Sequence, residues 1–269
     1  MTEAVSIESQ GSQLMVYTRG AGTPLVFLHA AVCDSRMWAR QMAHLSNSYR
    51  VIAYDRPGFG ESPPRTFASS SIADVLNVLD GLGIAEPAVL IGCSQGGRIA
   101  LETALTHPSK VQALFLIAPA LSGAPTPTYT PEIEIMLREQ QLTEQAEDWG
   151  RFNEIRARLW LDGPLSPAMR VDGDTRRLFL KMNAIAIAHR NQGGEIDKVP
   201  VFDQLAGIHA PTRVVWGDLD FPHVQQRAQR VSDQVPNGTG VLLPDIAHLP
   251  SIECPEKVSE LLEQFLTEI

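Results

Sequence analysis

The chain has 269 residues, of which 44% are hydrophobic and 20% charged, so it can bury a sizeable core, as one domain that carries an insertion. Its formal net charge of −9 disfavours nucleic acid and anionic membrane surfaces as partners. It has no apolar run near the ~20 residues that span a bilayer, and its start lacks the features of a signal peptide, so we expect a cytoplasmic protein.

Apolar strands alternate with helical patterns through the first half of the chain. Residues 4–7 and 14–18 predict an antiparallel edge hairpin. Further strands are expected at 25–28, 51–54, 89–91 and 113–117, and helices at 36–45, 71–82 and 95–107. This alternation is typical of an α/β fold, with a mostly parallel sheet that carries helices on both faces.

The helix expected at 71–82 has recognisable start and stop signals. Ser71 and Asp74 have a capping-box-like spacing at its beginning. Gly81 and Gly83 mark its end.

The pattern changes between residues 122 and 205, where prolines are followed by three helical stretches with no strand between them. We interpret this segment as a helical cap inserted into a core formed by residues 1–121 and 206–269. Strands are then expected at 213–216 and 240–243, with a helix at 223–235 between them, and a last helix is expected from Pro255.

Ser94 lies in a Gly-x-Ser-x-Gly pentapeptide between an expected strand and an expected helix. A serine on so sharp a turn has strained backbone angles, and the two glycines let neighbouring backbone approach without Cβ clashes. The nearby helix N-terminus favours developing negative charge. The sequence therefore predicts a serine nucleophile. Cys93 is adjacent, but the glycine spacing centres on Ser94, so we interpret Cys93 as a buried filler.

A serine hydroxyl becomes a good nucleophile when an imidazole takes its proton and a carboxylate orients that imidazole. His248 and Asp220 each follow an expected strand, so both should lie with Ser94 at the carboxyl edge of the sheet. Asp218 competes for the role of the acid. The Gly-x-x-Asp turn favours Asp220, because it gives the later carboxylate the reach to approach a histidine loop.

The three cysteines are widely spaced and include no Cys-x-x-Cys pair, so we expect reduced thiols and no metal site. No motif specifies an oligomeric state.

The pentapeptide, the order Ser94, Asp220, His248 along the chain, and the loop at 54–62 together resemble the α/β-hydrolase superfamily. The resemblance covers nearly the whole chain apart from the cap. It implies an eight-stranded core with a lid after the sixth strand. Aspartate-nucleophile branches, the haloalkane dehalogenases and epoxide hydrolases, do not fit Ser94.

The resemblance also implies that the loop after the third strand supplies one oxyanion-hole N–H. In this chain the two donors would be the backbone N–H groups of Ala31 and Gln95. The chain departs from the family where it has Ala30 in place of the usual glycine after the histidine. We interpret His29 as a structural residue that holds the loop.

The leading hypothesis is a serine hydrolase, of the carboxylesterase or lactonase type, that cleaves a small-molecule ester or lactone through an acyl-enzyme and needs no cofactor. Carbon–carbon bond hydrolysis or perhydrolysis with the same triad is the alternative. Leu249 weakens the former, because many such enzymes have tryptophan after the catalytic histidine. A ligand-binding receptor of the same fold is a third hypothesis. Candidate substrate-pocket residues are Trp38, Trp149, Phe152, Trp160, Phe179, Met182 and His189.

Overall fold

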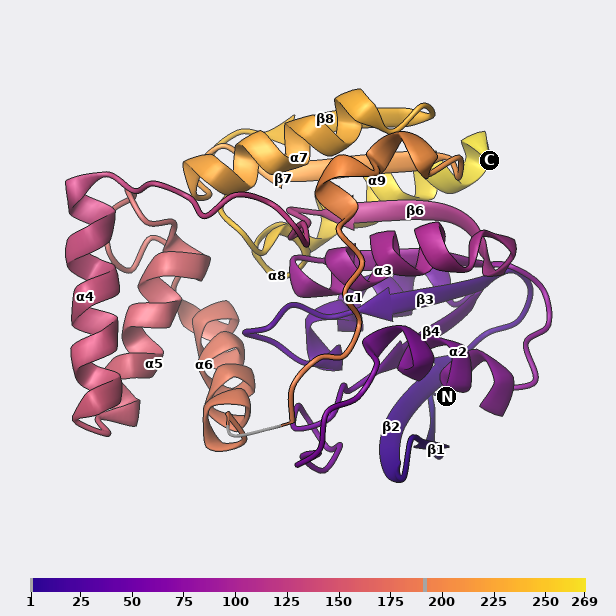
Figure 1. Ribbon diagram of the computed structural model, residues 1–269, viewed down its shortest axis with the longest axis horizontal. Helices are drawn as coiled ribbons and strands as arrows, with labels where there is room; N and C mark the ends of the chain where they lie inside the picture. The colour runs from indigo at the N-terminus through magenta and orange to yellow at the C-terminus, as the bar shows by residue number, and fades with distance from the viewer. Residues whose placement is uncertain (1, 191–192) are drawn as a thin grey trace.

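A computed structural model describes residues 2–190 and 193–269 of the chain. An eight-stranded sheet with the order β1-β2-β4-β3-β5-β6-β7-β8 runs through it (Figure 1). The strands are β1 (Glu3–Ser9), β2 (Ser12–Arg19), β3 (Pro24–Leu28), β4 (Arg50–Tyr54), β5 (Ala88–Cys93), β6 (Val111–Ile117), β7 (Thr212–Gly217) and β8 (Gly238–Leu243).

Among the strand pairs that the structure describes, only the two at the N-terminal edge of the sheet are antiparallel. The β1–β2 and β2–β4 pairs are antiparallel, and the pairs from β4 through β8 are parallel. Strands β3, β5 and β7 are buried along their whole length, as strands covered on both faces must be. The predicted edge hairpin and the eight-stranded, mostly parallel sheet are confirmed.

Helices cover both faces of the sheet, and the buried apolar side chains form two clusters. Side chains of α1 (Ala39–Leu45) and α9 (Pro255–Glu268) pack in one cluster. Those of α2 (Ser71–Gly81) and α3 (Gln95–Thr106) pack in the other. Helix α7 (Pro222–Gln234) contributes to both, and the short α8 (Pro250–Glu253) precedes α9.

The predicted capping box at the start of α2 is wrong. Ser70, not Ser71, is the N-cap, and its Oγ accepts a hydrogen bond from the Ala73 N–H at 2.9 Å. Asp74 then lies one residue beyond the N3 position that a capping box uses, and its carboxylate accepts hydrogen bonds from the guanidinium of Arg65. Both side chains of this ion pair are buried, which the local spacing of α2 could not indicate.

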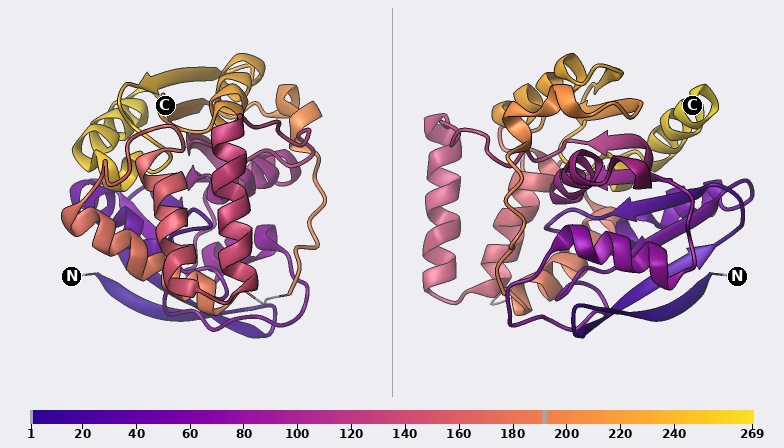
Figure 2. Two further views of the ribbon diagram at one scale, coloured as in Figure 1. Left: turned by 90° about the vertical axis from the view of Figure 1, so that its left-hand side faces the viewer. Right: turned by 45° about the vertical axis from the view of Figure 1, so that its right-hand side comes forward.

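Three further helices lie between β6 and β7, where the cap is expected. They are α4 (Pro131–Gln145), α5 (Trp149–Ala157), which continues into a π-helical turn (Arg158–Asp162), and α6 (Gly173–Ala188). Figures 1 and 2 show them gathered on one side of the sheet. The chain then returns along the core, where Ser69 forms an isolated parallel β-bridge with Glu195.

Candidate active site

The turn that carries Ser94 joins β5 to α3 and has strained backbone. Ser94 has a φ of 53°, in the left-handed region that side chains other than glycine rarely adopt. Its N–H donates to the Ile117 carbonyl at 2.9 Å, and its own carbonyl accepts from the Ala120 N–H at 3.0 Å. These two hydrogen bonds hold the turn in place. A Cβ atom on Gly92 would lie 2.5 Å from the Gly96 carbonyl oxygen, so the turn requires glycine there.

The start of α3 packs directly on the end of β3. A Cβ atom on Gly96 would lie 2.0 Å from the Leu28 carbonyl oxygen and 2.9 Å from that of His29. This contact brings the loop after β3, which carries Ala31, against the first turn of α3, which begins at Gln95. The first N–H groups of a helix have no partner within it, so they are available to a developing oxyanion.

His29 holds this loop through both of its ring nitrogens. Its Nδ1 lies 2.8 Å from the Ala30 carbonyl, and its Nε2 accepts from the Arg56 N–H at 3.1 Å. These partners fit a neutral ring with the proton on Nδ1. Complete burial lowers the pKa of His29 well below its usual value, which also favours the neutral form. These contacts give His29 a structural task in the loop.

Asp220 and His248 form a buried pair. The Asp220 Oδ2 atom lies 2.6 Å from His248 Nδ1, and both side chains are at most 3% exposed. The other carboxylate oxygen of Asp220 accepts from the Phe221 N–H at 2.7 Å. Asp218 is exposed. Its N–H donates to the Leu243 carbonyl and its own carbonyl accepts from the Gln225 side-chain amide, so both of these hydrogen bonds involve its backbone. The structure thus brings Asp220 rather than Asp218 to the histidine.

The His248 loop lies against the Ser94 turn. The thiol of Cys93, one residue before Ser94, is 3.8 Å from the His248 carbonyl oxygen. Burial raises the pKa of this thiol well above its usual range, and the charge of Asp220 acts in the same direction. Because the thiolate is the reactive form of cysteine, this environment disfavours Cys93 as a nucleophile.

One of the candidate pocket residues contacts the pair directly. The Trp160 ring lies 4.6 Å, centroid to centroid, from the His248 ring and 4.6 Å from that of Phe221. Trp160 belongs to the π-helical turn after α5, so this part of the insertion faces His248.

The remaining candidates lie elsewhere in the described chain. Trp38, Phe179 and Met182 are fully buried in the core, and the Trp38 ring packs on Phe27. Phe152 is also buried, and Trp149 packs between its ring and the Arg190 guanidinium. His189 lies with its Nδ1 3.2 Å from the Gly58 carbonyl oxygen.

His223 lies near the Asp220–His248 pair but is not among the site residues predicted from the sequence. Its ring packs on Phe221 and on Tyr129, and its Nδ1 is buried with no hydrogen-bond partner in the described chain. Burial lowers the pKa of His223 to about 4, while the nearby Asp220 carboxylate acts in the opposite direction. Its position three residues after Asp220 is the signal that could have found it.

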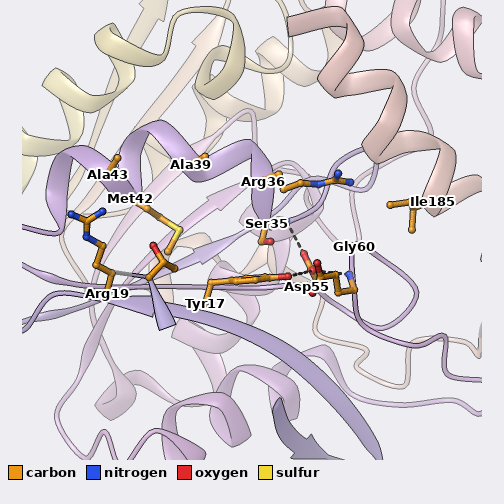
Figure 3. Close-up of a pocket in the computed structure, with 12 residues that line it drawn as sticks. Tyr17, Arg19, Ser35, Arg36, Ala39, Met42, Ala43, Asp55, Gly60 and Ile185 are labelled. Carbon is orange, nitrogen blue, oxygen red and sulfur yellow. Dashed lines mark hydrogen bonds between the residues drawn. The ribbon is translucent and has the colours of Figure 1, made fainter. Parts of the chain in front are cut away.

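A cavity of about 460 Å³ lies between β2, α1 and the loop after β4, with Ile185 of α6 at its rim (Figure 3). Its lining includes none of Ser94, Asp220 and His248. Asp55 at its inner end accepts hydrogen bonds from the Ser35 N–H at 2.9 Å and the Tyr17 hydroxyl at 3.3 Å. It is therefore separate from the candidate active site.

Within residues 2–190 and 193–269, no cluster of three or more His, Cys, Asp or Glu side chains is arranged to hold a metal ion. None of the helices described there is long and apolar enough to cross a membrane.

Comparison with known proteins agrees with the resemblance carried by the sequence motifs. The model of the alpha/beta hydrolase family matches residues 25–261. Pimeloyl-[acyl-carrier protein] methyl ester esterases are among the related sequences. That of Pectobacterium atrosepticum is 29% identical over 92% of this chain and 96% of its own length, and that of a Shewanella strain is 30% identical over 95% of each.

Solved structures share the fold. An esterase from Thermogutta terrifontis has a TM-score of 0.78 and 23% identity, covering 99% of this chain and 98% of its own. The enol-lactonase from Burkholderia xenovorans has a TM-score of 0.76 and 22% identity, covering 98% of this chain and all of its own.

Proposed function

Because this chain belongs to the α/β-hydrolase family, we propose that it is a serine hydrolase that cleaves a small carboxylic ester or lactone through an acyl-enzyme. The observation that carries the proposal is the buried Asp220–His248 pair, 2.6 Å apart, with His248 on a loop that lies against the strained Ser94 turn. Related sequences named as esterases support ester bonds as the target.

In the proposed reaction, Ser94 Oγ attacks the carbonyl carbon while His248 Nε2 takes the hydroxyl proton. Asp220 keeps the ring proton on Nδ1 and stabilises the imidazolium that forms. Nε2 is then the atom left to accept and return protons. His248 protonates the leaving alkoxide, and afterwards activates a water that releases the acid.

The negative oxygen of the tetrahedral intermediate would accept hydrogen bonds from the N–H groups of Ala31 and Gln95. The close packing of Gly96 on Leu28 supports this pairing, since it places the two donor segments together before any substrate arrives. Each preorganised donor of this kind contributes roughly 10²- to 10³-fold in kcat.

We further propose that residues 122–205 act as the cap over this site. Trp160, which comes from that segment, packs on His248 and so forms part of the wall around the reacting atoms. A substrate seated at Ser94 would therefore touch both the sheet side and the helical insertion.

A substrate panel tests the proposal. Short-chain methyl and aryl esters and lactones should be cleaved by the wild type, and Ser94→Ala should abolish the turnover. Turnover of a dienoate ketone exceeding that of every ester by orders of magnitude would establish carbon–carbon hydrolysis instead. Formation of peracid from an ester and peroxide, at a rate above hydrolysis, would establish perhydrolysis. Tight ligand binding without turnover would indicate a receptor.

A further inference from the structure

Arg170 joins the helical insertion to the loop that carries His248. Its guanidinium donates four hydrogen bonds. Two stay within the insertion: Nε donates to the Asp162 carbonyl at 2.7 Å, and Nη2 to the Leu161 carbonyl at 3.0 Å. The other two, from Nη1, go to the core, where they reach the Asp245 carbonyl at 3.0 Å and the Glu253 carboxylate at 2.6 Å. One side chain thus binds both segments at once, a contact that we call the Arg170 clamp.

On the side of the insertion, the clamp holds the turn that carries Trp160. The two carbonyls that Arg170 binds end the π-helical turn after α5, and Trp160 is the residue just before them. The Trp160 ring lies 4.6 Å from the His248 ring, with the two planes inclined by 52°. By fixing the end of this turn, the clamp fixes where the indole lies against the imidazole.

The carboxylate of Asp162 in turn fixes the backbone around Arg170. It is fully buried and accepts from the N–H groups of Met169 at 3.0 Å and Val171 at 3.1 Å, the residues on either side of Arg170. It also accepts from the Arg176 guanidinium. Because its backbone is already held, Arg170 loses less conformational freedom when it binds the core.

On the side of the core, Glu253 extends the clamp to the residue before His248. One of its carboxylate oxygens accepts from Arg170, and the other accepts from the Ala247 N–H at 3.3 Å. Its side chain is only 6% exposed; burial raises the pKa of Glu253, and the bond to Arg170 opposes the rise.

The other core contact of the clamp is at a strained point of the same loop. Asp245 has a φ of 60°, in the left-handed region, and such a conformation persists only where the surroundings hold it. Arg170 binds the carbonyl of this residue. The clamp therefore supports the His248 loop at two places, Asp245 and Ala247.

The clamp also has a special place among the charged contacts of the insertion. Within residues 2–190 and 193–269, two ion pairs join residues 122–205 to the core: Arg170–Glu253 and Arg98–Glu195. Glu195 lies on the segment that returns to the core after α6. Arg170 thus supplies the ion pair by which the helical part of the insertion is bound to the core.

We propose that Arg170 is a positioning residue, which clamps the Trp160 turn to the His248 loop so that the imidazole is held between Asp220 at its edge and Trp160 on its face. Its effect on catalysis rests on the proposed function, in which His248 is the base. A displacement of about 1 Å in a reacting group can cost roughly 10²-fold in rate, so a device that fixes the imidazole acts on kcat.

The kinetic test replaces the guanidinium with an uncharged chain of similar length. Arg170→Met should lower kcat for a short-chain ester roughly 10- to 100-fold, because the imidazole is no longer held where proton transfer needs it. KM should change by less than about threefold, because no contact with the substrate is lost. Arg170→Lys should give an intermediate kcat, since its ammonium keeps the pair with Glu253 but cannot hold four acceptors in this geometry.

A double variant separates positioning from stability. Arg170→Met leaves the Glu253 carboxylate buried without its cation, which by itself destabilises the protein. Arg170→Met/Glu253→Gln removes that stranded charge, so its thermal midpoint should return toward that of the wild type while its kcat stays low. Recovery of kcat together with the midpoint would show that Arg170 serves stability alone and would overturn the inference.

Arg151→Met is the matched control, because Arg151 and Glu139 form an ion pair that stays within the insertion and is exposed. It should leave both kcat and KM within about twofold of the wild type.

Hydrogen exchange measured by mass spectrometry supplies a readout that needs no turnover. In Arg170→Met, amide exchange should become at least roughly tenfold faster in residues 158–162 and 245–249 and stay unchanged in the central strand β5. If the wild type cleaves no ester but this local acceleration is seen, the proposed hydrolase function fails and the clamp stands. If esters are cleaved but Arg170→Met changes neither kcat nor the exchange of these two segments, the inference about Arg170 is overturned and the proposed function stands.

Discussion

Gly217 and Ile246 are in backbone contact: a Cβ atom on Gly217 would lie 2.0 Å from the Ile246 carbonyl oxygen. The same carbonyl accepts from the Leu219 N–H at 2.9 Å. The end of β7 is thereby fixed to the loop that carries His248. Because the turn is held at residues 217 and 219, the side chain at 220 points to the histidine and the one at 218 is left in solvent.

This arrangement predicts different effects for the two aspartates. Asp220→Asn should lower kcat about 10⁴-fold, because an amide at this position favours the wrong histidine tautomer. Asp218→Asn should change kcat by less than about twofold. Ester hydrolysis by the two purified variants is the measurement, and an equal loss in both would refute the assignment of the acid.

A second prediction concerns the contact between α3 and β3. Gly96→Ala should destabilise the protein by about 1–3 kcal/mol and lower kcat/KM at least tenfold, because the new methyl group displaces the Leu28 carbonyl and separates the two proposed oxyanion donors. Gly150→Ala, at an exposed position of α5 where the nearest atom to the added Cβ lies 3.7 Å away, should be neutral or stabilising. Urea unfolding and ester hydrolysis on both variants test the contrast. Wild-type activity in Gly96→Ala would show that the close packing is dispensable.

A third prediction concerns the buried ion pair that replaces the expected capping box. Arg65→Met should lower the free energy of unfolding by about 3 kcal/mol or more, since it leaves the Asp74 carboxylate buried without its cation. Arg177→Met removes an exposed pair with Asp174 and should change this free energy by no more than about 0.5 kcal/mol. Denaturant titration measures both. Similar values for the two variants would contradict the importance of burial.

The fourth prediction is a pH dependence of stability. The pKa of His223 is about 4 in the folded protein against an ordinary 6.5, so between these values the unfolded chain binds more protons at this residue. Stability contributed by His223 is therefore present above pH 6.5 and is lost as the pH falls toward 4. His223→Gln should lose less free energy of unfolding between pH 7 and pH 5 than the wild type does.

His209→Gln is the control for the fourth prediction, because His209 is exposed. It should follow the wild type. A His223→Gln curve parallel to that of the wild type would mean that burial of this ring does not hold it neutral.

Much of the fold could be predicted because its signals are local. The alternation of short apolar runs with helical periods predicts each of the eight strands in the sheet. The glycines two residues before and after Ser94 predict a tight turn, in which a Cβ atom at either position would clash with backbone. The partnership of Asp74 with Arg65 could not be found in this way, since nothing in the spacing of α2 reveals a cation that another loop brings to it.

The walls of the site were harder to predict for a related reason. Aromatic residues of the insertion have the same helical spacing whether they face the core or the substrate. Phe179 is fully buried in the core, whereas Trp160 contacts His248, and only the packing of the insertion on the sheet separates the two.

The central claim is that His248 activates the hydroxyl of Ser94. Reaction with a fluorophosphonate probe, followed by peptide mapping, tests it most directly, because the probe modifies serines made nucleophilic by a neighbouring base. We predict stoichiometric labelling at Ser94 in the wild type and at least a 10³-fold slower reaction in His248→Ala. Labelling of Ser94 at the same rate in both proteins, or labelling at another residue, would contradict the account.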